Sequence, residues 1–519
     1  MRRAVLAPKR RGGSVNRTVS ISPPTGGWNA RDPLSGMGAA DALTLENWLV
    51  TPGGIRVRPG KQTWATGLGT YVESLMPWFS ASGNNKLFAA VPNNIYDVTA
   101  QAAVGPAVQT GLSNGRWQHT NFATPGGQYL VLVNGSDAPR HYNGTIWTSP
   151  VITGTYNGVA LNANNFIHVE PHVGRLWFVE KSTLRGWYLP VLQIAGTATP
   201  FDLGPFCSLG GELLASASWT VDGGQGPDDY AAFITSRGQV VVYQGTDPDN
   251  AATWQLRGIY KIPEPLGRRC TYKLGGELII LTIQGPIALS QAMSLSETGQ
   301  ANQALTTKIG NAWRQAAEFS SASFGWQVSE NPRYGFMVMN VPVRERVQQD
   351  QYVFSTQTGA WSKFTGLNAG CFAWFGTAMF FGGNDGTVYR LDGVADLGLP
   401  ILASYQHAFT DLRSVSNKRL VMARPRIVAP PSYLPAVHIK TDLDTSPVPY
   451  RTIPPGDAGP AWDVTAWDEA YWGADSVSTQ GWQGVEGIGT TVSVAFRVAA
   501  TAPVMLNGVD LTYEVGGLL

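Results

Sequence analysis

The residues whose types and spacing suggest chemistry are few, and the clearest group is a glutamate between two histidines. His168, Glu170 and His172 alternate along an otherwise apolar segment. Two histidines four residues apart can hold a metal ion on one face of a helix, but Pro171 lies between them and is incompatible with an intact helix. We therefore expect strand residues with hydrogen-bonded imidazoles, and we predict neither a metal site nor a cofactor.

Motifs for nucleophilic, phosphate and glycoside chemistry are also absent from the sequence. It contains neither a GxxxxGK[ST] loop nor a G-x-S-x-G nucleophile elbow. The segment from Thr246 to Trp254 resembles the aspartate box of sialidase propellers, but its aspartates are out of register and it occurs once. Glycoside hydrolysis also needs two carboxylates at a defined separation. We predict that the protein is not an enzyme, with a carbohydrate-binding or glycan-degrading β-propeller as the alternative.

The three cysteines, Cys207, Cys270 and Cys371, are too far apart in the sequence for a Cys-x-x-Cys pair. An odd and scattered set argues against a disulfide framework and against a zinc site. We expect three buried free thiols.

The composition indicates a folded, β-rich protein. Charged residues make up 14% of the 519 positions, against roughly 25% in an average soluble protein, while 60 glycines, 34 prolines and 18 tryptophans favour turns and strands. The hydrophobic content of 43% argues against disorder. A net charge of +1 excludes a globally basic nucleic-acid binder. We expect no membrane span and no signal peptide, hence assembly in a cytoplasm, because the apolar runs are short.

A repeated pattern of short strands runs between residues 71 and 395. An apolar strand, a Gly/Asn turn and a short aromatic strand recur seven times, as in Lys86–Val91 followed by Ile95–Val98. Such a period of about 40 to 50 residues is typical of propeller blades, although an array of β-sandwiches would give a similar pattern. We predict an all-β protein with a β-propeller-like repeat of about seven blades, within a range of about six to eight.

The remaining segments differ from this repeat. Residues 300–319 are rich in Ala and Gln, with apolar residues at helical spacing, and predict an inserted packing helix. Residues 396–519, in which prolines cluster before two final strands, predict a small C-terminal β domain. Residues 1–25 predict a basic flexible arm, and 26–70 a separate N-terminal segment. The arm either is a solvated tail or contacts phosphate or an acidic partner through basic side chains, namely Arg2, Arg3, Lys9, Arg10 and Arg11.

Several short motifs lie at both ends and in the middle of the chain. An N-terminal signature consists of Gly26–Pro33, Asp41–Trp48 and Gly53–Gly60. Further motifs are Tyr243–Pro248, the tryptophan-rich stretch from Trp462 to Gly473, and the ending Tyr513–Gly517. Together these motifs resemble those of the tail nozzle proteins of short-tailed bacteriophages, the tail tubular protein B type, and of related tail-hub proteins.

This resemblance implies a structural role in the virion tail. Such proteins form a ring, usually a homohexamer, below the portal and adaptor proteins, and line the channel that retains and passes double-stranded DNA without sequence specificity. Tail fibre or needle proteins are implied as further partners. Few charges and many tryptophans suit broad subunit interfaces, although the tryptophans also fill blade cores. A carbohydrate-active propeller and a host propeller acting as an interaction scaffold are the competing hypotheses.

Two groups of residues are predicted to form structural braces or contacts with other subunits and partners. The residue types in both groups do not fit a blade core. The first is Trp28, Asn29, Arg31, Asp32, Asn47, Arg58 and Pro59, and the second is Trp462, Asp463, Trp467, Asp468 and Trp472. For the second group, an exposed aromatic docking surface and a core staple are both consistent with the sequence.

Overall fold

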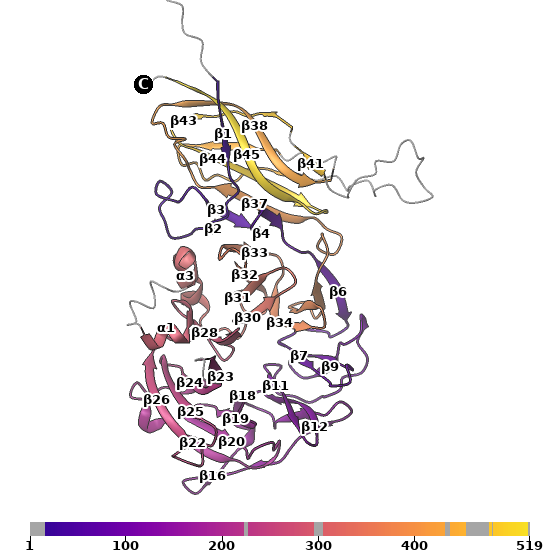
Figure 1. Ribbon diagram of the computed structural model, residues 1–519. Helices are drawn as coiled ribbons and strands as arrows, with labels where there is room; N and C mark the ends of the chain where they lie inside the picture. The colour runs from indigo at the N-terminus through magenta and orange to yellow at the C-terminus, as the bar shows by residue number, and fades with distance from the viewer. Residues whose placement is uncertain are drawn as a thin grey trace, which may run out of the picture. The chain divides into compact units, whose positions relative to one another are not determined.

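The computed structural model describes residues 16–222, 227–294, 305–430, 436–452, 477–479 and 481–516. The chain divides into two compact units, and each is described by itself. Unit 1 combines Met1–Arg58 with Gly398–Leu519, and unit 2 is the continuous segment Pro59–Leu397. Both units consist mainly of β-strands (Figure 1), as the composition predicted.

Among the described residues of unit 2, groups of three or four antiparallel paired strands recur seven times, and we number them as blades 1 to 7 in chain order. Blade 1 comprises β7 (Ser74–Trp78), β8 (Lys86–Ala90) and β9 (Ile95–Asp97), and blade 2 comprises β11 (Gln118–Thr124), β12 (Gly127–Val133), β13 (Arg140–Tyr142) and β14 (Trp147–Thr148). Blade 3 comprises β18 (Phe166–His172), β19 (Arg175–Glu180), β20 (Arg185–Tyr188) and β22 (Thr199–Asp202). Blade 4 comprises β23 (Leu213–Asp222), β24 (Pro227–Thr235), β25 (Gln239–Gly245) and β26 (Trp254–Lys261).

Blades 5 to 7 complete the set. Blade 5 comprises β27 (Thr271–Leu274), β28 (Glu277–Thr282) and β29 (Gly285–Ala288). Blade 6 comprises β30 (Gln327–Asn331), β31 (Phe336–Arg344), β32 (Gln348–Ser355) and β33 (Trp361–Phe364). Blade 7 comprises β34 (Ala369–Phe375), β35 (Ala378–Gly383), β36 (Val388–Leu391) and β6 (Lys61–Thr66). Shorter elements in the connections are β10 (Ala102–Ala103), β15 (Ile152–Thr153), β16 (Thr155–Tyr156), β17 (Val159–Ala160), β21 (Gly196–Thr197), η1 (Ala163–Asn165) and η2 (Gly204–Phe206).

The first strands of the seven blades form a closed ring. Strand β7 contacts β11, and contacts then continue in chain order through β18, β23, β27, β30 and β34, which returns to β7. A ring of radially arranged sheets that each contact only their two neighbours is a β-propeller. The predicted propeller is therefore confirmed, and its repeat corresponds to seven blades (Figure 1).

The ring is closed by a strand from the other end of unit 2. Strand β6 pairs antiparallel with β36, with Lys61 opposite Leu391 and Ala65 opposite Val388. The blade formed last in the sequence thus receives its outer strand from the first residues of the unit. Gly60 makes this close approach feasible, because its amide donates to the Gly393 carbonyl at 2.9 Å and a Cβ there would lie 2.1 Å from the Ala395 oxygen.

The hydrophobic core of unit 2 lies between neighbouring blades. One cluster joins blades 2 and 3 and includes Val131, Phe166 and Phe178, and another joins blades 7 and 1. A single four-stranded sheet leaves two apolar faces exposed, so stacking against both neighbours is what makes each blade stable. The three cysteines are free and buried, as expected, and burial raises the pKa of Cys270 and of Cys371 to about 12.

Helices interrupt the repeat between blades 5 and 6. They are α1 (Leu289–Ser294), η3 (Thr307–Ile309) and α3 (Gly310–Ser320). The sequence predicted a helix over 300–319 at this place; the described helix begins at Gly310, and residues 300–304 lie outside the described residues. Trp313 fixes α3 by donating from Nε1 to the Thr282 carbonyl at 2.9 Å. Within the described ranges, no helix is long and apolar enough to cross a membrane.

Unit 1 is built from two groups of paired strands. The first group is β4 (Trp48–Thr51), β5 (Gly54–Val57), β45 (Met505–Val515), β38 (Lys418–Ala429) and β41 (Val477–Thr479), with β1 (Asn16–Ile21) on β45 and with β42 (Gln483–Gly484) and β43 (Ile488–Gly489) on β38. The second is β3 (Asp41–Glu46), β37 (Ile401–His407), β44 (Val492–Ala500) and β39 (His438–Thr441), with β2 (Gly27–Trp28) on β3 and β40 (Tyr450–Thr452) on β44.

The division into units differs from the predicted domain boundaries 1–25, 26–70, 71–395 and 396–519. Residues 26–58 belong with the C-terminal β domain, and residues 59–70 belong with the propeller. Part of the predicted arm is also strand, because β1 pairs with β45 over Asn16↔Glu514 to Ile21↔Val509. These pairings join residues almost 500 positions apart, which no local pattern in the sequence signals. Residues 1–15 of the arm lie outside the described residues.

Candidate functional site

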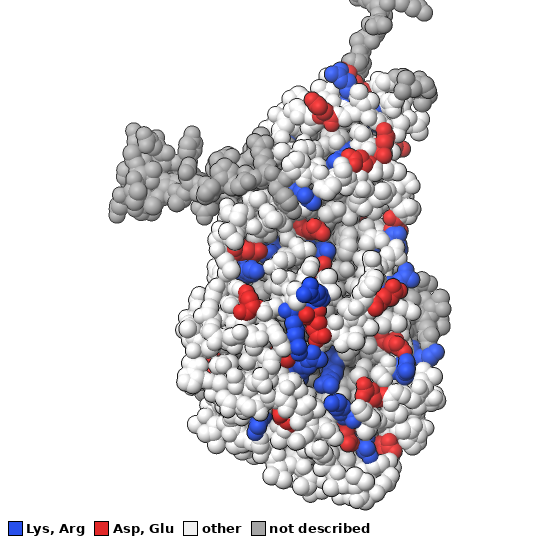
Figure 2. Space-filling view, turned by 180° about the vertical axis from the view of Figure 1, so that it is seen from behind, with Lys and Arg blue, Asp and Glu red and all other residues white. Residues whose placement is uncertain are grey.

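Charged side chains gather in the middle of one face of unit 2 (Figure 2). Four charged residues of this unit stand just before the first strand of a blade: Glu73 precedes β7, Arg116 precedes β11, and Arg268 and Arg269 precede β27. Because these first strands surround the propeller axis, the residues that precede them converge at one end of the central channel. Arg346 joins them from the turn between β31 and β32.

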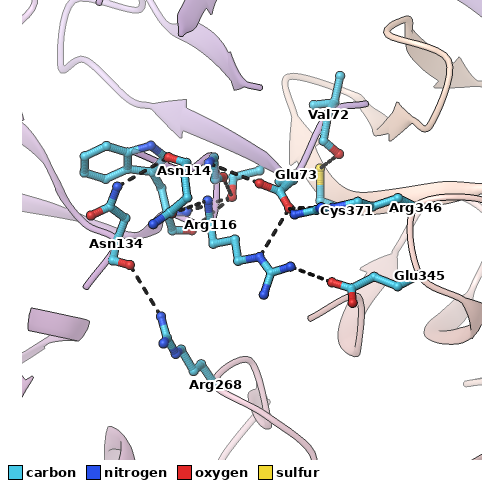
Figure 3. Close-up of polar contacts among 12 residues, drawn as sticks. Val72, Glu73, Asn114, Arg116, Asn134, Arg268, Glu345, Arg346 and Cys371 are labelled. Carbon is cyan, nitrogen blue, oxygen red and sulfur yellow. Dashed lines mark hydrogen bonds and ion pairs between the residues drawn. The ribbon is translucent and has the colours of Figure 1, made fainter. Parts of the chain in front are cut away.

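The carboxylate of Glu73 is the centre of this group (Figure 3). Its side chain is only 5% exposed. Oε1 accepts from Arg116 Nε at 3.2 Å and from Arg346 Nη2 at 2.9 Å, and Oε2 accepts from the Gly115 amide at 3.1 Å. Arg116 also binds Glu345 at 2.7 Å. The network therefore links blades 1, 2 and 6 by charge-assisted hydrogen bonds, the strongest kind that side chains make.

Arg269 connects blade 5 to the same network. Its Nη2 donates to Ser74 Oγ at 2.7 Å and to the Glu73 carbonyl at 3.0 Å. The guanidinium carbon lies 4.2 Å from the centre of the Phe324 ring, a cation–π contact. Burial lowers the pKa of Arg269 to about 10, so the group still carries its positive charge at neutral pH.

The channel has an excess of positive charge. Farther along it, Lys273 of β27 binds Glu170 of β18 at 2.6 Å. Five cationic groups (Arg116, Arg268, Arg269, Lys273 and Arg346) thus lie with three carboxylates (Glu73, Glu170 and Glu345), and the charge of Glu212 also acts on Arg268. Burial, and then the neighbouring Arg116, lower the pKa of Arg268, which is the expected direction for a cation crowded by another cation away from water.

A cavity of about 190 Å³ occupies the channel beside these residues. Its walls come from the first strands or the preceding residues of blades 1, 2, 3, 5, 6 and 7. They are Leu75, Trp117, Gln118, His119, His168, Val169, Glu170, Arg268, Arg269, Thr271, Gln327, Val328 and Cys371. The lining thus combines two arginines with amide, imidazole and hydroxyl groups.

The histidines that the sequence singled out lie on one face of β18. This segment is a strand, as Pro171 predicted. His168 Nδ1 accepts from the Ser216 amide at 3.5 Å, and His172 Nδ1 is 3.0 Å from Ser218 Oγ. Burial, with smaller contributions from Arg268 and Lys273, lowers the pKa of His168 to about 4. Among the described residues, no group of three or more His, Cys, Asp or Glu side chains could hold a metal ion.

The first part of the N-terminal signature forms a buried cluster of hydrogen-bonded polar residues in unit 1. Asn29 is fully buried, and its Nδ2 donates to Asp32 and to Asp41, both at 2.8 Å. Its Oδ1 accepts from the amides of Arg31 and Asp32. Arg31 and Asp32 form an ion pair at 2.7 Å, and Trp28 lies in β2. These contacts are those of an internal brace.

The second part of the signature is also tied down within unit 1. Asn47 adopts a left-handed backbone with φ of 60° between β3 and β4. Its Nδ2 donates to the Leu402 carbonyl at 2.7 Å, and its Oδ1 accepts from Arg58 Nε at 2.9 Å. Arg58 is 2% exposed, and Pro59 is the first residue of unit 2. A role of these residues in subunit contacts stays a prediction.

The other predicted residues fall outside the described ranges. They are the tryptophan-rich group Trp462, Asp463, Trp467, Asp468 and Trp472, and the basic residues Arg2, Arg3, Lys9, Arg10 and Arg11. The channel residues were missed by the sequence reasoning. A signal was present, because Gly115-Arg116 and Gly267-Arg268 place a Gly-Arg pair just before the first strand of a repeat in a chain with few charges.

No protein-family model and no curated protein matches the sequence. Several solved β-propellers are distantly similar to the chain. The computationally designed Ika8 protein shares 9% identity and covers 64% of this chain and 99% of its own, with a TM-score of 0.35. BBS1N in complex with ARL6DN shares 11% and covers 66% and 100%, with a TM-score of 0.39. YCF48 from Cyanidioschyzon merolae shares 10% and covers 64% and 98%, with a TM-score of 0.28. The propeller assignment rests on the strand topology of the chain itself.

Proposed function

We propose that the protein is a structural component of a bacteriophage tail, a nozzle or hub subunit that forms a ring around the path of the DNA. The observation that carries this proposal is the N-terminal signature between Gly26 and Gly60, which resembles that of short-tailed phage nozzle proteins. In unit 1 its polar residues Asn29, Asn47 and Arg58 are buried with specific partners. Buried polar residues of this kind are costly to replace, so their types reflect the fold of this unit.

The architecture of unit 2 is compatible with a mechanical role. The seven blades are closed by the pairing of β6 with β36, and the channel end is crosslinked by Glu73, Arg116 and Arg346. A subunit that surrounds DNA under pressure needs modules that resist opening. A propeller that is closed by the pairing of β6 with β36 is such a module. The three carboxylates named in the channel are all engaged by basic side chains, an arrangement that does not favour the glycan-degrading alternative.

The proposal is tested by the assembly state of the full-length protein. Negative-stain electron microscopy and analytical ultracentrifugation of the purified chain are expected to show rings, with six copies as the expected number. Mass spectrometry of virions that carry the gene should find the protein in the tail. A chain that remains monomeric at all concentrations and is missing from tail particles would contradict the proposal, and glycan binding or turnover would favour the alternative.

A matched pair of variants tests the predicted interface. The triple change Trp462→Ala, Trp467→Ala and Trp472→Ala is expected to reduce ring formation at least tenfold, since aromatic residues dominate interface energetics. The control is Trp482→Ala, a partly exposed tryptophan whose ring lies 4.9 Å from the Arg424 guanidinium within the same unit. Equal ring formation by both variants would remove the tryptophan-rich group from the interface.

A further inference from the structure

We propose that the cavity in the propeller channel is a binding site for a small tetrahedral oxyanion, either free phosphate or sulfate or the phosphate group of a larger molecule. This inference does not depend on the proposed function. It concerns the cavity of about 190 Å³ inside unit 2, lined by Gln118, Arg268 and Arg269.

The first support is that two buried donors at this cavity have no protein acceptor. Arg269 Nη1 and Gln118 Nε2 are both inaccessible to solvent and make no hydrogen bond to any described residue. Leaving a buried donor unsatisfied costs about 1 to 3 kcal/mol, and more when it is charged. The neighbouring Nη2 of Arg269 is engaged with Ser74 and the Glu73 carbonyl, so the guanidinium of this lining residue is held in place with Nη1 unpaired.

The second support is the charge balance of the lining. Arg268 has no carboxylate partner among the described residues and makes one long hydrogen bond, 3.4 Å, from Nη1 to the Asn134 carbonyl. Among the described residues, Glu170 is the only carboxylate of the lining, and its negative charge is matched by Lys273 at 2.6 Å. The lining thus holds two guanidinium groups and no free carboxylate, while Glu73 and Glu212 act on these arginines from outside the lining. Arginine is well suited to oxyanions because its planar donors match two oxygens at once.

Neutral donors complete the lining. Because His168 Nδ1 accepts from the Ser216 amide, its ring proton at neutral pH resides on Nε2 and can be donated. The hydroxyl of Thr271 and the amide of Gln327 also border the cavity. At roughly 30 Å³ per water molecule, the cavity has room for an anion of phosphate size with a few waters. A metal cation is disfavoured by the same positive excess.

The test is sulfate binding by the full-length protein. Calorimetric titration with sulfate and with inorganic phosphate, against sodium chloride at equal ionic strength, is expected to show one saturable site. Arg268→Gln should weaken this site at least tenfold, and Gln118→Leu should weaken it several-fold by removing a neutral donor. The matched control, Arg237→Gln, removes the same charge from a residue that is 60% exposed, pairs with Glu264 and does not line the cavity. It should bind sulfate as the parent does.

The outcomes distinguish a free anion from a phosphate ester, and they decide whether the cavity binds an oxyanion at all. Adenosine monophosphate that binds more tightly than phosphate assigns a phosphate ester, whereas binding of inorganic anions alone assigns a free anion. Thermal unfolding without anion checks that each variant is folded, and if Arg268→Gln is not, Gln118→Leu decides. The proposal is overturned if sulfate and phosphate have no effect beyond that of ionic strength, or if Arg268→Gln and Arg237→Gln bind equally well.

Discussion

Replacing Glu73 by glutamine should destabilise the propeller without changing its shape. The substitution keeps the size of the side chain but removes the negative charge that two arginines and the Gly115 amide bind. It also places an amide NH₂ group against donors. Removing one partner of a buried ion pair costs about 3 to 5 kcal/mol, but Arg116 and Arg346 are 32% and 41% exposed and can turn to water. We therefore expect the free energy of unfolding of the propeller to decrease by about 2 to 3 kcal/mol.

This loss can be measured as a change in the melting temperature. An unfolding entropy of about 2.1 cal/mol/K per residue applied to the 339 residues from Pro59 to Leu397 converts it into a decrease of roughly 3 to 4 °C. Differential scanning calorimetry of the full chain is suitable, because the two units can be followed as separate transitions when they do not unfold together. A double-mutant cycle with Arg346→Gln should give a coupling energy of about 1 kcal/mol.

The control is Glu264→Gln, which removes a carboxylate that is 49% exposed and pairs with the exposed Arg237. Such surface pairs contribute about 0 to 1 kcal/mol, so its melting temperature should change by less than about 1.5 °C. If Glu73→Gln behaves like this control, the reasoning is refuted, because the channel carboxylate would then contribute no more than a surface ion pair.

Three further predictions concern other parts of the chain. Asn29→Ala should destabilise unit 1 by about 2 to 4 kcal/mol in urea unfolding, since it leaves the buried Asp41 without its amide donor. An effect below about 1 kcal/mol would show that the polar cluster around Asn29 contributes little to the stability of unit 1. His141 is 1% exposed, and burial lowers its pKa from 6.5 to about 4, so its own contribution to stability, complete above pH 6.5, should fall by about 3 kcal/mol as the pH decreases to 4. His119 and His168, whose pKa values burial lowers in the same way, add to this dependence, so His141→Leu should reduce its slope and not abolish it; an unchanged slope would assign it to other groups. Gly60→Ala should destabilise the ring by about 3 kcal/mol or more through its clash with the Ala395 carbonyl, whereas Gly105→Ala, with open space around its Cβ position, should not; equal melting temperatures would show that the backbone yields at Gly60.

Local periodicity in the sequence was sufficient to predict the propeller. The predicted strands Lys86–Val91 and Ile95–Val98 correspond to β8 and β9 within one residue at their ends, because alternation and turn residues are properties of adjacent positions. Which chain segments make up unit 1 could not be predicted in the same way. Strand β1 pairs with β45 across nearly the whole chain, and β6 leaves the N-terminal segment to complete blade 7. Long-range pairing of this kind has no local signature.

The channel site was missed for a related reason. Glu73, Arg116 and Arg346 are separated by 43 to 273 positions, and only the closed ring brings them together. The Asn29 group shows the opposite case. Its partners Asp32 and Asp41 are close in the sequence, so residue type and spacing identified the segment before its contacts were known.

The arrangement of unit 1 in two separate stretches determines when it can fold. Its first 58 residues leave the ribosome early, but their strand partners β37 and β45 follow only after the 339 residues of the propeller. At about 5 to 20 residues per second, that interval is roughly 20 to 70 seconds. During this time the propeller can latch as soon as β36 emerges and binds the waiting β6. During this interval the early strands of unit 1 have only local partners, since β4 pairs with β5 and β2 with β3. The edges of β3 and β5 that later bind β37 and β45 stay open, and unpaired strand edges are the part of the nascent chain most dependent on protection from aggregation.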